Sequence, residues 1–167
     1  SIDTYFEKIK RKTACLIAAC SKGGAILSEA SDEQVDLLYS YGINLGIAFQ
    51  IIDDILDYTE DQSTIGKPAG NDLRQGMVTL PLIYALQKPS ANGHQQQVQY
   101  LLSEKDHKEK DILEVVSWVT HGYGIEQAMS DAYAYAEKAR ADLYHFPPSS
   151  NRAILDELID FVVRRRR

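Results

Sequence analysis

The chain has 167 residues, of which 44% are hydrophobic and 25% are charged, and its formal net charge is −6 at pH 7. This length and composition are typical of a globular domain with a substantial core, which excludes a disordered segment. The acidic balance excludes a general nucleic-acid binder, and no apolar run approaches the roughly 20 residues of a membrane span, so we expect no transmembrane segment.

The first part of the chain predicts two long helices. Residues 4–28 repeat apolar positions near the helical period and contain Gly23-Gly24, where we expect a kink. Ser31-Asp32-Glu33-Gln34 has the form of a capping box and begins a helix that runs to about Tyr58. Gly42 and Gly46 in this helix would let a neighbour approach closely, so we expect it to be central.

The second part predicts shorter helices between loops. Residues 60–76 are rich in turn-forming residues, Thr79 has the features of a helix N-cap with Pro81 in the first turn, and residues 88–97 read as a flexible surface loop. Further helices are expected near 96–103, 108–120, 124–145 and 150–163. Because no segment alternates like a strand, the fold class is expected to be all-α, without an internal repeat or domain boundary.

The two cysteines, Cys15 and Cys20, lie in an apolar helical stretch at a spacing that does not place them on one face. We expect buried thiols in a reducing, cytoplasmic compartment. No charged leader followed by an apolar run is visible at the N-terminus, so no secretory signal is expected.

Three carboxylates, Asp53, Asp54 and Asp57, gather at the end of the second predicted helix. Asp53 and Asp57 are four residues apart and share a face, where like charges repel and the helix dipole also disfavours anions. A cation would relieve this, and oxygen ligands suit Mg²⁺, which often completes its shell with substrate phosphate. The motif therefore predicts a Mg²⁺–diphosphate site, with a solvated acidic helix end as the alternative.

Two lysines are placed to serve the same diphosphate. Lys67 follows Asp57 by ten residues in Gly66-Lys67-Pro68, and Lys12 lies on the preceding helix. A calcium loop beginning at Asp53 is excluded, because Ile55 and Tyr58 occupy positions that need an oxygen ligand and a glycine.

Several strings together resemble trans-polyprenyl diphosphate synthases, most closely long-chain enzymes of the heptaprenyl and solanesyl type. They are Phe49-Gln50-Ile51-Ile52-Asp53-Asp54-Ile55-Leu56-Asp57-Tyr58, Gly66-Lys67-Pro68, Asn71-Asp72-Leu73 and Thr79-Leu80-Pro81-Leu82, with Lys12-Thr13-Ala14 upstream. The resemblance implies the C-terminal portion of an isoprenoid synthase-type helical bundle, with residues 1–167 as the C-terminal part of a single synthase domain.

The resemblance also implies a reaction, the head-to-tail condensation of isopentenyl diphosphate with an allylic diphosphate, assisted by Mg²⁺. It carries roles over position by position. The metal ligands are Asp53, Asp54 and Asp57, the diphosphate contacts are Lys12 and Lys67, the oxygen dipoles facing the allylic cation are Thr13 and Gln50, and Phe49 flanks the isopentenyl site. Thr13, Gln50 and Lys67 are thus the expected catalytic residues.

The departure from that family is the absence of the first aspartate-rich motif and of the upstream contacts for isopentenyl diphosphate. We therefore expect a fragment that is inactive alone, exposes apolar helix faces and needs the missing N-terminal half or a partner subunit, in a homodimer or heterodimer. For the Arg164–Arg167 tail, a solvated charged end and a flap over the diphosphates are the two readings.

Three rival functions stay open at this stage. The chain could be a noncatalytic helical subunit of a two-component prenyl synthase, or a fragment like a class I terpene cyclase, which also uses an Asp-Asp-x-x-Asp motif. It could also be an unrelated helical binding module, which would not respond to Mg²⁺ plus diphosphate.

Overall fold

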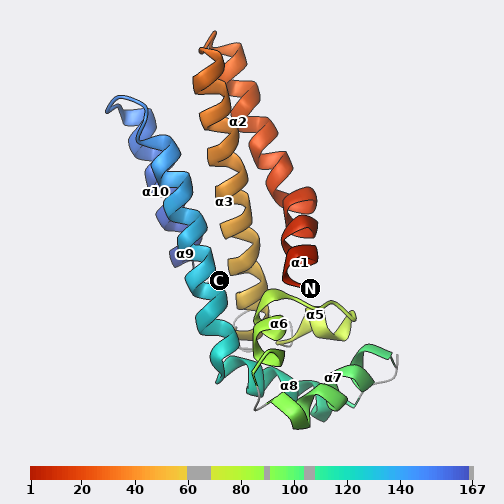
Figure 1. The fold of residues 1–167 in the computed structure, drawn as a ribbon. Helices are drawn as coiled ribbons and strands as arrows, with labels where there is room; N and C mark the ends of the chain where they lie inside the picture. The colour runs from red at the N-terminus through yellow and green to blue at the C-terminus, as the bar shows by residue number, and fades with distance from the viewer. Residues whose placement is uncertain (60–68, 89–90, 104–107, 166–167) are drawn as a thin grey trace. The chain divides into compact units, whose positions relative to one another are not determined.

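The computed structural model describes residues 1–59, 69–88, 91–103 and 108–165, and its helices are labelled in Figure 1. Within these residues no β-strand occurs, which confirms the all-α fold class. The elements are α1 (Ile2–Ile9), the π-helix η1 (Lys10–Ala14), α2 (Cys15–Leu27), α3 (Asp32–Thr59), α5 (Asn71–Arg74), α6 (Leu80–Leu86), α7 (Asn92–Ser103), α8 (Glu109–Thr120), α9 (Tyr123–Leu143) and α10 (Ser150–Arg164).

The chain forms two compact units. The bundle unit comprises residues 3–52 and 130–165, and the short-helix unit comprises residues 53–129 with residues 1–2, described only in the ranges given above. The long helices α3 and α9 each contribute residues to both units.

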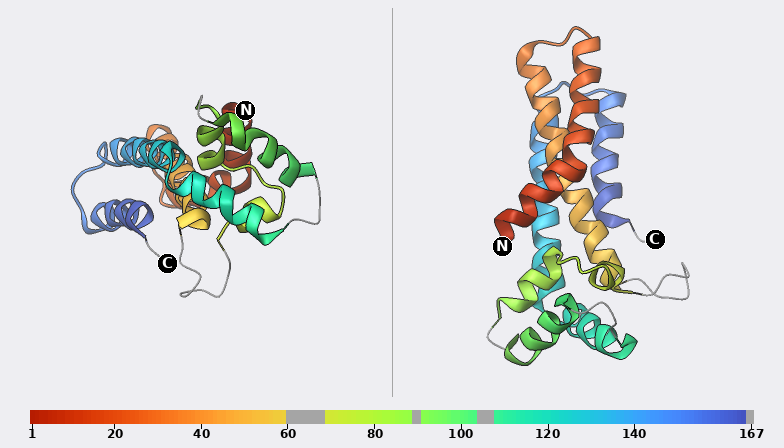
Figure 2. Two further views of the ribbon diagram at one scale, coloured as in Figure 1. Left: turned by 90° about the horizontal axis from the view of Figure 1, so that it is seen from below. Right: turned by 90° about the vertical axis from the view of Figure 1, so that its right-hand side faces the viewer.

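The bundle unit contains α1, η1 and four long helical segments that run side by side, namely α2, the first part of α3, the last part of α9, and α10 (Figure 1 and Figure 2). The start of α3 forms as the sequence predicts: the Ser31 amide donates to the Gln34 side chain at 3.1 Å, and the Gln34 amide donates to Ser31 Oγ at 3.3 Å. The core contains Tyr41, Leu45, Ala48, Ala136, Ala139, Leu143, Ile159, Val162 and Val163.

The predicted irregularity in the first helix is present, but at a different place. The helix continues through Gly23-Gly24 and changes instead to a π-turn at Lys10–Ala14. The two glycines have open space around them, so no packing contact forces the backbone to bend there. The kink predicted at the glycines was therefore wrong.

The short-helix unit contains the end of α3, α5 to α8 and the start of α9. Its core contains Tyr58, Leu73, Leu82, Ala85, Val98, Leu101, Ile112, Val115, Val116 and Val119. Thr79 is the N-cap residue of α6 with Pro81 in the first turn, as predicted, although its side chain makes no capping hydrogen bond.

Two loop predictions in this unit need correction. Residues 71–74 form α5 inside the expected loop, and α7 begins at residue 92, where a flexible loop was expected. The polar start of α7 is held by α8: the His94 ring stacks on Trp118 with centroids 4.2 Å apart, and Gln97 donates to Glu114 at 3.0 Å. Tertiary contacts thus override the weak apolar signal of the segment.

One further expectation is not met, and the estimate of apolar run length needs correction. Cys15 is half-buried and Cys20 is exposed, both as free thiols, so the buried cysteines predicted from the apolar stretch are wrong. By length and composition alone, α3 would suffice to cross a membrane, contrary to the estimate from apolar runs, and 56% of its most apolar window is buried inside the protein.

Candidate functional site

The contact between α2 and α3 sets the position of the Lys12-Thr13 motif. A Cβ atom built on Gly46 would lie 2.5 Å from the Cα of Ala14, and one built on Gly42 would lie 2.5 Å from the Cα of Ala18. Both alanines are fully buried. The two helices therefore touch backbone to backbone, as the spacing of the glycines predicted, and this contact holds the end of the π-turn against α3.

Thr13 and Gln50 are brought together within the bundle unit. Thr13 Oγ1 donates a hydrogen bond to Gln50 Oε1 over 2.6 Å, from the π-turn to α3. Gln50 is only 7% exposed, while Lys12, one residue before Thr13, is exposed. The pair of oxygen dipoles that the sequence placed in one site thus lies in a largely buried setting, where dipoles act most strongly.

Phe49 lies next to Gln50 on α3 and has a partner that sequence reasoning missed. Arg165, which follows the end of α10, places its guanidinium carbon 3.9 Å from the centroid of the Phe49 ring and donates from Nη2 to the Phe49 carbonyl oxygen at 3.0 Å. The solvated-tail reading is therefore wrong at Arg165, whereas Arg164 is exposed and pairs with Asp160 at 3.6 Å.

Asp57 anchors the start of α5. Its two carboxylate oxygens accept the backbone N–H groups of Asn71 and Asp72 at 3.2 Å and 3.0 Å, and its carbonyl oxygen accepts the Gly70 N–H at 2.8 Å. Burial raises the pKa of the Asp57 carboxyl, against the lowering effect of these two amide hydrogen bonds. Asp57 therefore ties the chain after the undescribed residues 60–68 back to the end of α3.

The other two carboxylates lie on the same helix in the short-helix unit. Asp54 is 5% exposed and Asp53 is half-buried, and both interact with neighbouring groups. Burying charged carboxylates is costly unless they are paired or bound to a cation. The clustering of the three aspartates at the end of α3 is thus as the sequence predicted.

The three aspartates offer the type of ligand atom that a hard divalent cation prefers. All three side chains offer oxygen only, and each oxygen of Asp57 accepts one amide hydrogen, which leaves lone pairs for a metal. In the described part of the chain no group of three or more His, Cys, Asp and Glu side chains is arranged to hold an ion by itself. Water and substrate phosphate would have to complete the shell, as is usual for Mg²⁺.

Two predicted residues stand differently from the rest. Lys67 lies outside the described residues, so its predicted role stays a prediction. Lys12 is exposed on the π-turn next to Thr13. Sequence reasoning missed the amides of Asn71 and Asp72, although the string Gly70-Asn71-Asp72 has the residue types of a helix start.

Comparison with known proteins identifies the family. The model of the polyprenyl synthetase family matches residues 1–119. A prenyl transferase of Synechocystis is 38% identical over 164 residues, which are 98% of this chain and 49% of that protein. Heptaprenyl diphosphate synthase component 2 of Bacillus subtilis is 36% identical over 166 residues, which are 99% of this chain and 46% of the relative.

Solved structures agree with this result. A polyprenyl synthase from Caulobacter crescentus, complexed with calcium and isoprenyl diphosphate, is similar with a TM-score of 0.92 and 36% identity, over 100% of this chain and 51% of that chain. Heptaprenyl diphosphate synthase from Staphylococcus aureus gives a TM-score of 0.91 and 30% identity, over 99% of this chain and 51% of that chain.

The fold is therefore that of the all-α isoprenoid synthases. The chain spans about half the length of the curated relatives that it matches. Because the family model covers well over half of the chain, the chain belongs to the polyprenyl synthetase family.

Proposed function

We propose that the chain supplies one half of the active site of a Mg²⁺-dependent trans-prenyltransferase, the half that carries the second aspartate-rich motif. The complete site condenses isopentenyl diphosphate with an allylic diphosphate. The observation that carries the proposal is the hydrogen bond of 2.6 Å between Thr13 and Gln50. Gln50 lies on α3, the helix that also bears the aspartates. Gln50, Asp53 and Asp57 follow one another in the sequence at intervals of three and four residues, the spacing that is typical of one helix face.

The proposed reaction breaks the allylic C–O bond, and the electron pair leaves with the diphosphate. The double bond of isopentenyl diphosphate then attacks the allylic cation to form a carbon–carbon bond, and loss of a proton gives a chain longer by one isoprene unit. The oxygen lone pairs of Thr13 and Gln50 stabilise the cation, since preorganised dipoles in a dry site act without reorganisation. Phe49 flanks the isopentenyl site.

The leaving diphosphate needs positive charge. Lys12 and Lys67 are proposed to contact it through their ammonium groups. Asp53 and Asp57 are proposed to hold Mg²⁺, with Asp54 as a further ligand or as support for them, and the bound ion would neutralise the departing diphosphate. Asp57 would then have two tasks, because it also anchors the start of α5.

The rest of the site is proposed to come from outside this chain. The relatives are about twice as long, and one of them is named as a component of a heptaprenyl synthase. We therefore propose that residues 1–167 form the C-terminal part of a synthase domain, that an N-terminal half or a partner subunit completes it in a homodimer or heterodimer, and that the assembly works in the cytoplasm.

A condensation assay tests the proposal. The chain alone, and the chain mixed with the N-terminal half of the Synechocystis relative, receive Mg²⁺, an allylic diphosphate and labelled isopentenyl diphosphate. We expect product only in the mixture, and none from the mixture with Asp53→Ala. Asp36→Ala is the matched control, because Asp36 is an exposed carboxylate on the same helix, and it should retain activity.

A binding measurement adds a second readout. In a thermal shift assay with Mg²⁺, pyrophosphate at a concentration of about 100 times its dissociation constant should stabilise the folded mixture by about 2.7 kcal/mol. A folded mixture that shows neither condensation nor this shift would contradict the catalytic proposal and favour a noncatalytic subunit.

A further inference from the structure

The contact between Arg165 and Phe49 has two parts that make different demands on the side chain. The guanidinium carbon lies 3.9 Å from the ring centroid, and Nη2 donates to the Phe49 carbonyl oxygen at 3.0 Å. A planar guanidinium can stack on a ring and donate in its own plane at the same time, whereas a lysine ammonium has no such plane. The contact is therefore specific for arginine.

The position of Arg165 is fixed by the helix that precedes it. Val162 and Val163 are 4% and 6% exposed, and Ile159 is fully buried, so the last turns of α10 are held in the core of the bundle unit. The backbone at Arg165 is extended, with φ −59° and ψ 133°, which ends the helix at Arg164. The side chain of Arg165 thus reaches Phe49 from an anchored point.

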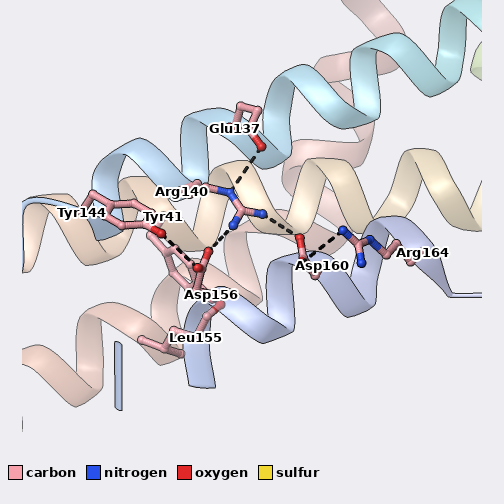
Figure 3. Close-up of polar contacts among 8 residues, drawn as sticks. All are labelled: Tyr41, Glu137, Arg140, Tyr144, Leu155, Asp156, Asp160 and Arg164. Carbon is pink, nitrogen blue, oxygen red and sulfur yellow. Dashed lines mark hydrogen bonds and ion pairs between the residues drawn. The ribbon is translucent and has the colours of Figure 1, made fainter. Parts of the chain in front are cut away.

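Polar contacts lock α10 in the same place (Figure 3). Arg140 on α9 pairs with Asp156 and also donates to Asp160 at 2.7 Å, and Tyr41 on α3 donates to the Leu155 carbonyl oxygen at 3.1 Å. Helix α10 is therefore tied to both α9 and α3 before the chain reaches Arg165. Contacts of this kind restrict both sliding and rotation of the helix.

We propose that Arg165 is a positioning residue: by stacking on Phe49 and binding its carbonyl oxygen, it fixes the ring that flanks the isopentenyl site. This inference rests on the proposed function. The ring is half-buried against the bundle core and is next to Gln50, so a ring released from Arg165 can turn toward or away from the substrate beside it. The role depends on the shape of the guanidinium, and a cation that only attracts diphosphate would not fulfil it.

The test uses the active mixture defined above with four single variants and one double variant, Phe49→Leu with Arg165→Ala. Arg165→Lys keeps the charge and removes the stacking plane, and Arg165→Ala removes both. Arg164→Ala is the matched control, because Arg164 is the adjacent, exposed arginine, paired only with Asp160 among the contacts described above. Phe49→Leu removes the ring. Each variant is measured for the KM of isopentenyl diphosphate, the KM of the allylic diphosphate and kcat.

We expect Arg165→Lys and Arg165→Ala each to raise the KM of isopentenyl diphosphate by about tenfold, with a smaller change in the other constants. Arg164→Ala should leave all three unchanged. In the Phe49→Leu background, Arg165→Ala should have no further effect, since the group it positions is gone. Rescue by Arg165→Lys, or equal losses from Arg164→Ala, would overturn the proposal and indicate a tail that acts by charge.

A second measurement separates this inference from the proposed function. In NMR spectra of the chain, the Arg165 side-chain N–H resonances should be shifted upfield by the ring and should return to ordinary values in Phe49→Leu. Absence of the shift overturns the positioning role whatever the activity. A shift that is present in a mixture without condensation overturns the proposed function, and the positioning role with it.

Discussion

Replacing Gly46 by alanine should force α2 away from α3. The new Cβ atom would lie 2.5 Å from the Cα and 2.8 Å from the Cβ of Ala14, whereas carbon atoms in contact are normally about 3.5–4.0 Å apart. Because the obstacle is backbone, no change of rotamer relieves the clash, and the helices must separate by about 1 Å. Alanine gains roughly 1 kcal/mol of helix propensity, and overpacking costs about 1–3 kcal/mol or more.

We therefore expect Gly46→Ala to lower the free energy of unfolding by about 2 kcal/mol in urea denaturation. Gly23→Ala is the control: it lies in the helical stretch of α2 with nothing within 4 Å of its Cβ position, and it should raise stability by about 0.5–1 kcal/mol. A Gly46→Ala protein as stable as the wild type would refute the reasoning.

The same displacement should reach the candidate site. Thr13 directly precedes Ala14, so a shift of about 1 Å would lengthen its 2.6 Å hydrogen bond to Gln50 beyond the usual limit of about 3.2 Å. In the active mixture, Gly46→Ala should thus lose more condensation activity than its loss of folded protein explains, while Gly23→Ala should not.

Three further predictions concern single polar groups. Burial raises the pKa of Tyr41 to about 12 from 10.0, so its hydroxyl ionises first in the unfolded chain and the wild type should lose stability as pH rises from about 10 to 12. In urea denaturation, Tyr41→Phe should show a smaller loss over this pH range, because burial also raises the pKa of Tyr58, and it should cost about 1 kcal/mol at neutral pH through the missing bond to Leu155. Asp57→Asn should weaken the anchor of α5, since an amide side chain has one acceptor oxygen in place of two. Hydrogen exchange at the first two backbone amides of α5 should become at least severalfold faster, and unchanged exchange would contradict the anchoring role. Arg140→Gln should destabilise the chain by about 1–2 kcal/mol by leaving its two aspartate partners on α10 without the guanidinium, and 1 M salt should narrow the difference from the wild type in thermal unfolding.

The long helices could be read from the sequence because their signals are local. The capping box at Ser31 and Gln34 and the glycine pair at Gly42 and Gly46 act within one or two turns, and the structure contains both features as predicted. The aspartates could be found for the same reason, since their spacing on α3 follows directly from the helical period.

What the sequence did not reveal depends on contacts between distant residues. The helical start of α7 depends on Trp118, 24 residues beyond His94, and the contact of Arg165 with Phe49 joins residues 116 positions apart. The exposure of Cys20 likewise follows from which face of α2 meets α3. Residue type and local spacing carry no information on such pairings.

The π-turn at Lys10–Ala14 explains how one continuous helical segment serves two buried faces. Tyr5 and Ile9 are buried on α1, and Ala14 is fully buried at the end of the π-turn. In a regular α-helix the nine steps from Tyr5 to Ala14 would rotate the chain by roughly 900°, which places the two residues on opposite sides. The extra residue in the π-turn removes about 100° of that rotation and leaves them roughly 80° apart. A deletion of one residue within the turn would therefore leave eight regular steps of about 100° between Tyr5 and Ala14, the same total of roughly 800°, so it would restore an ideal helix and keep the buried side chains of α1 on their present face.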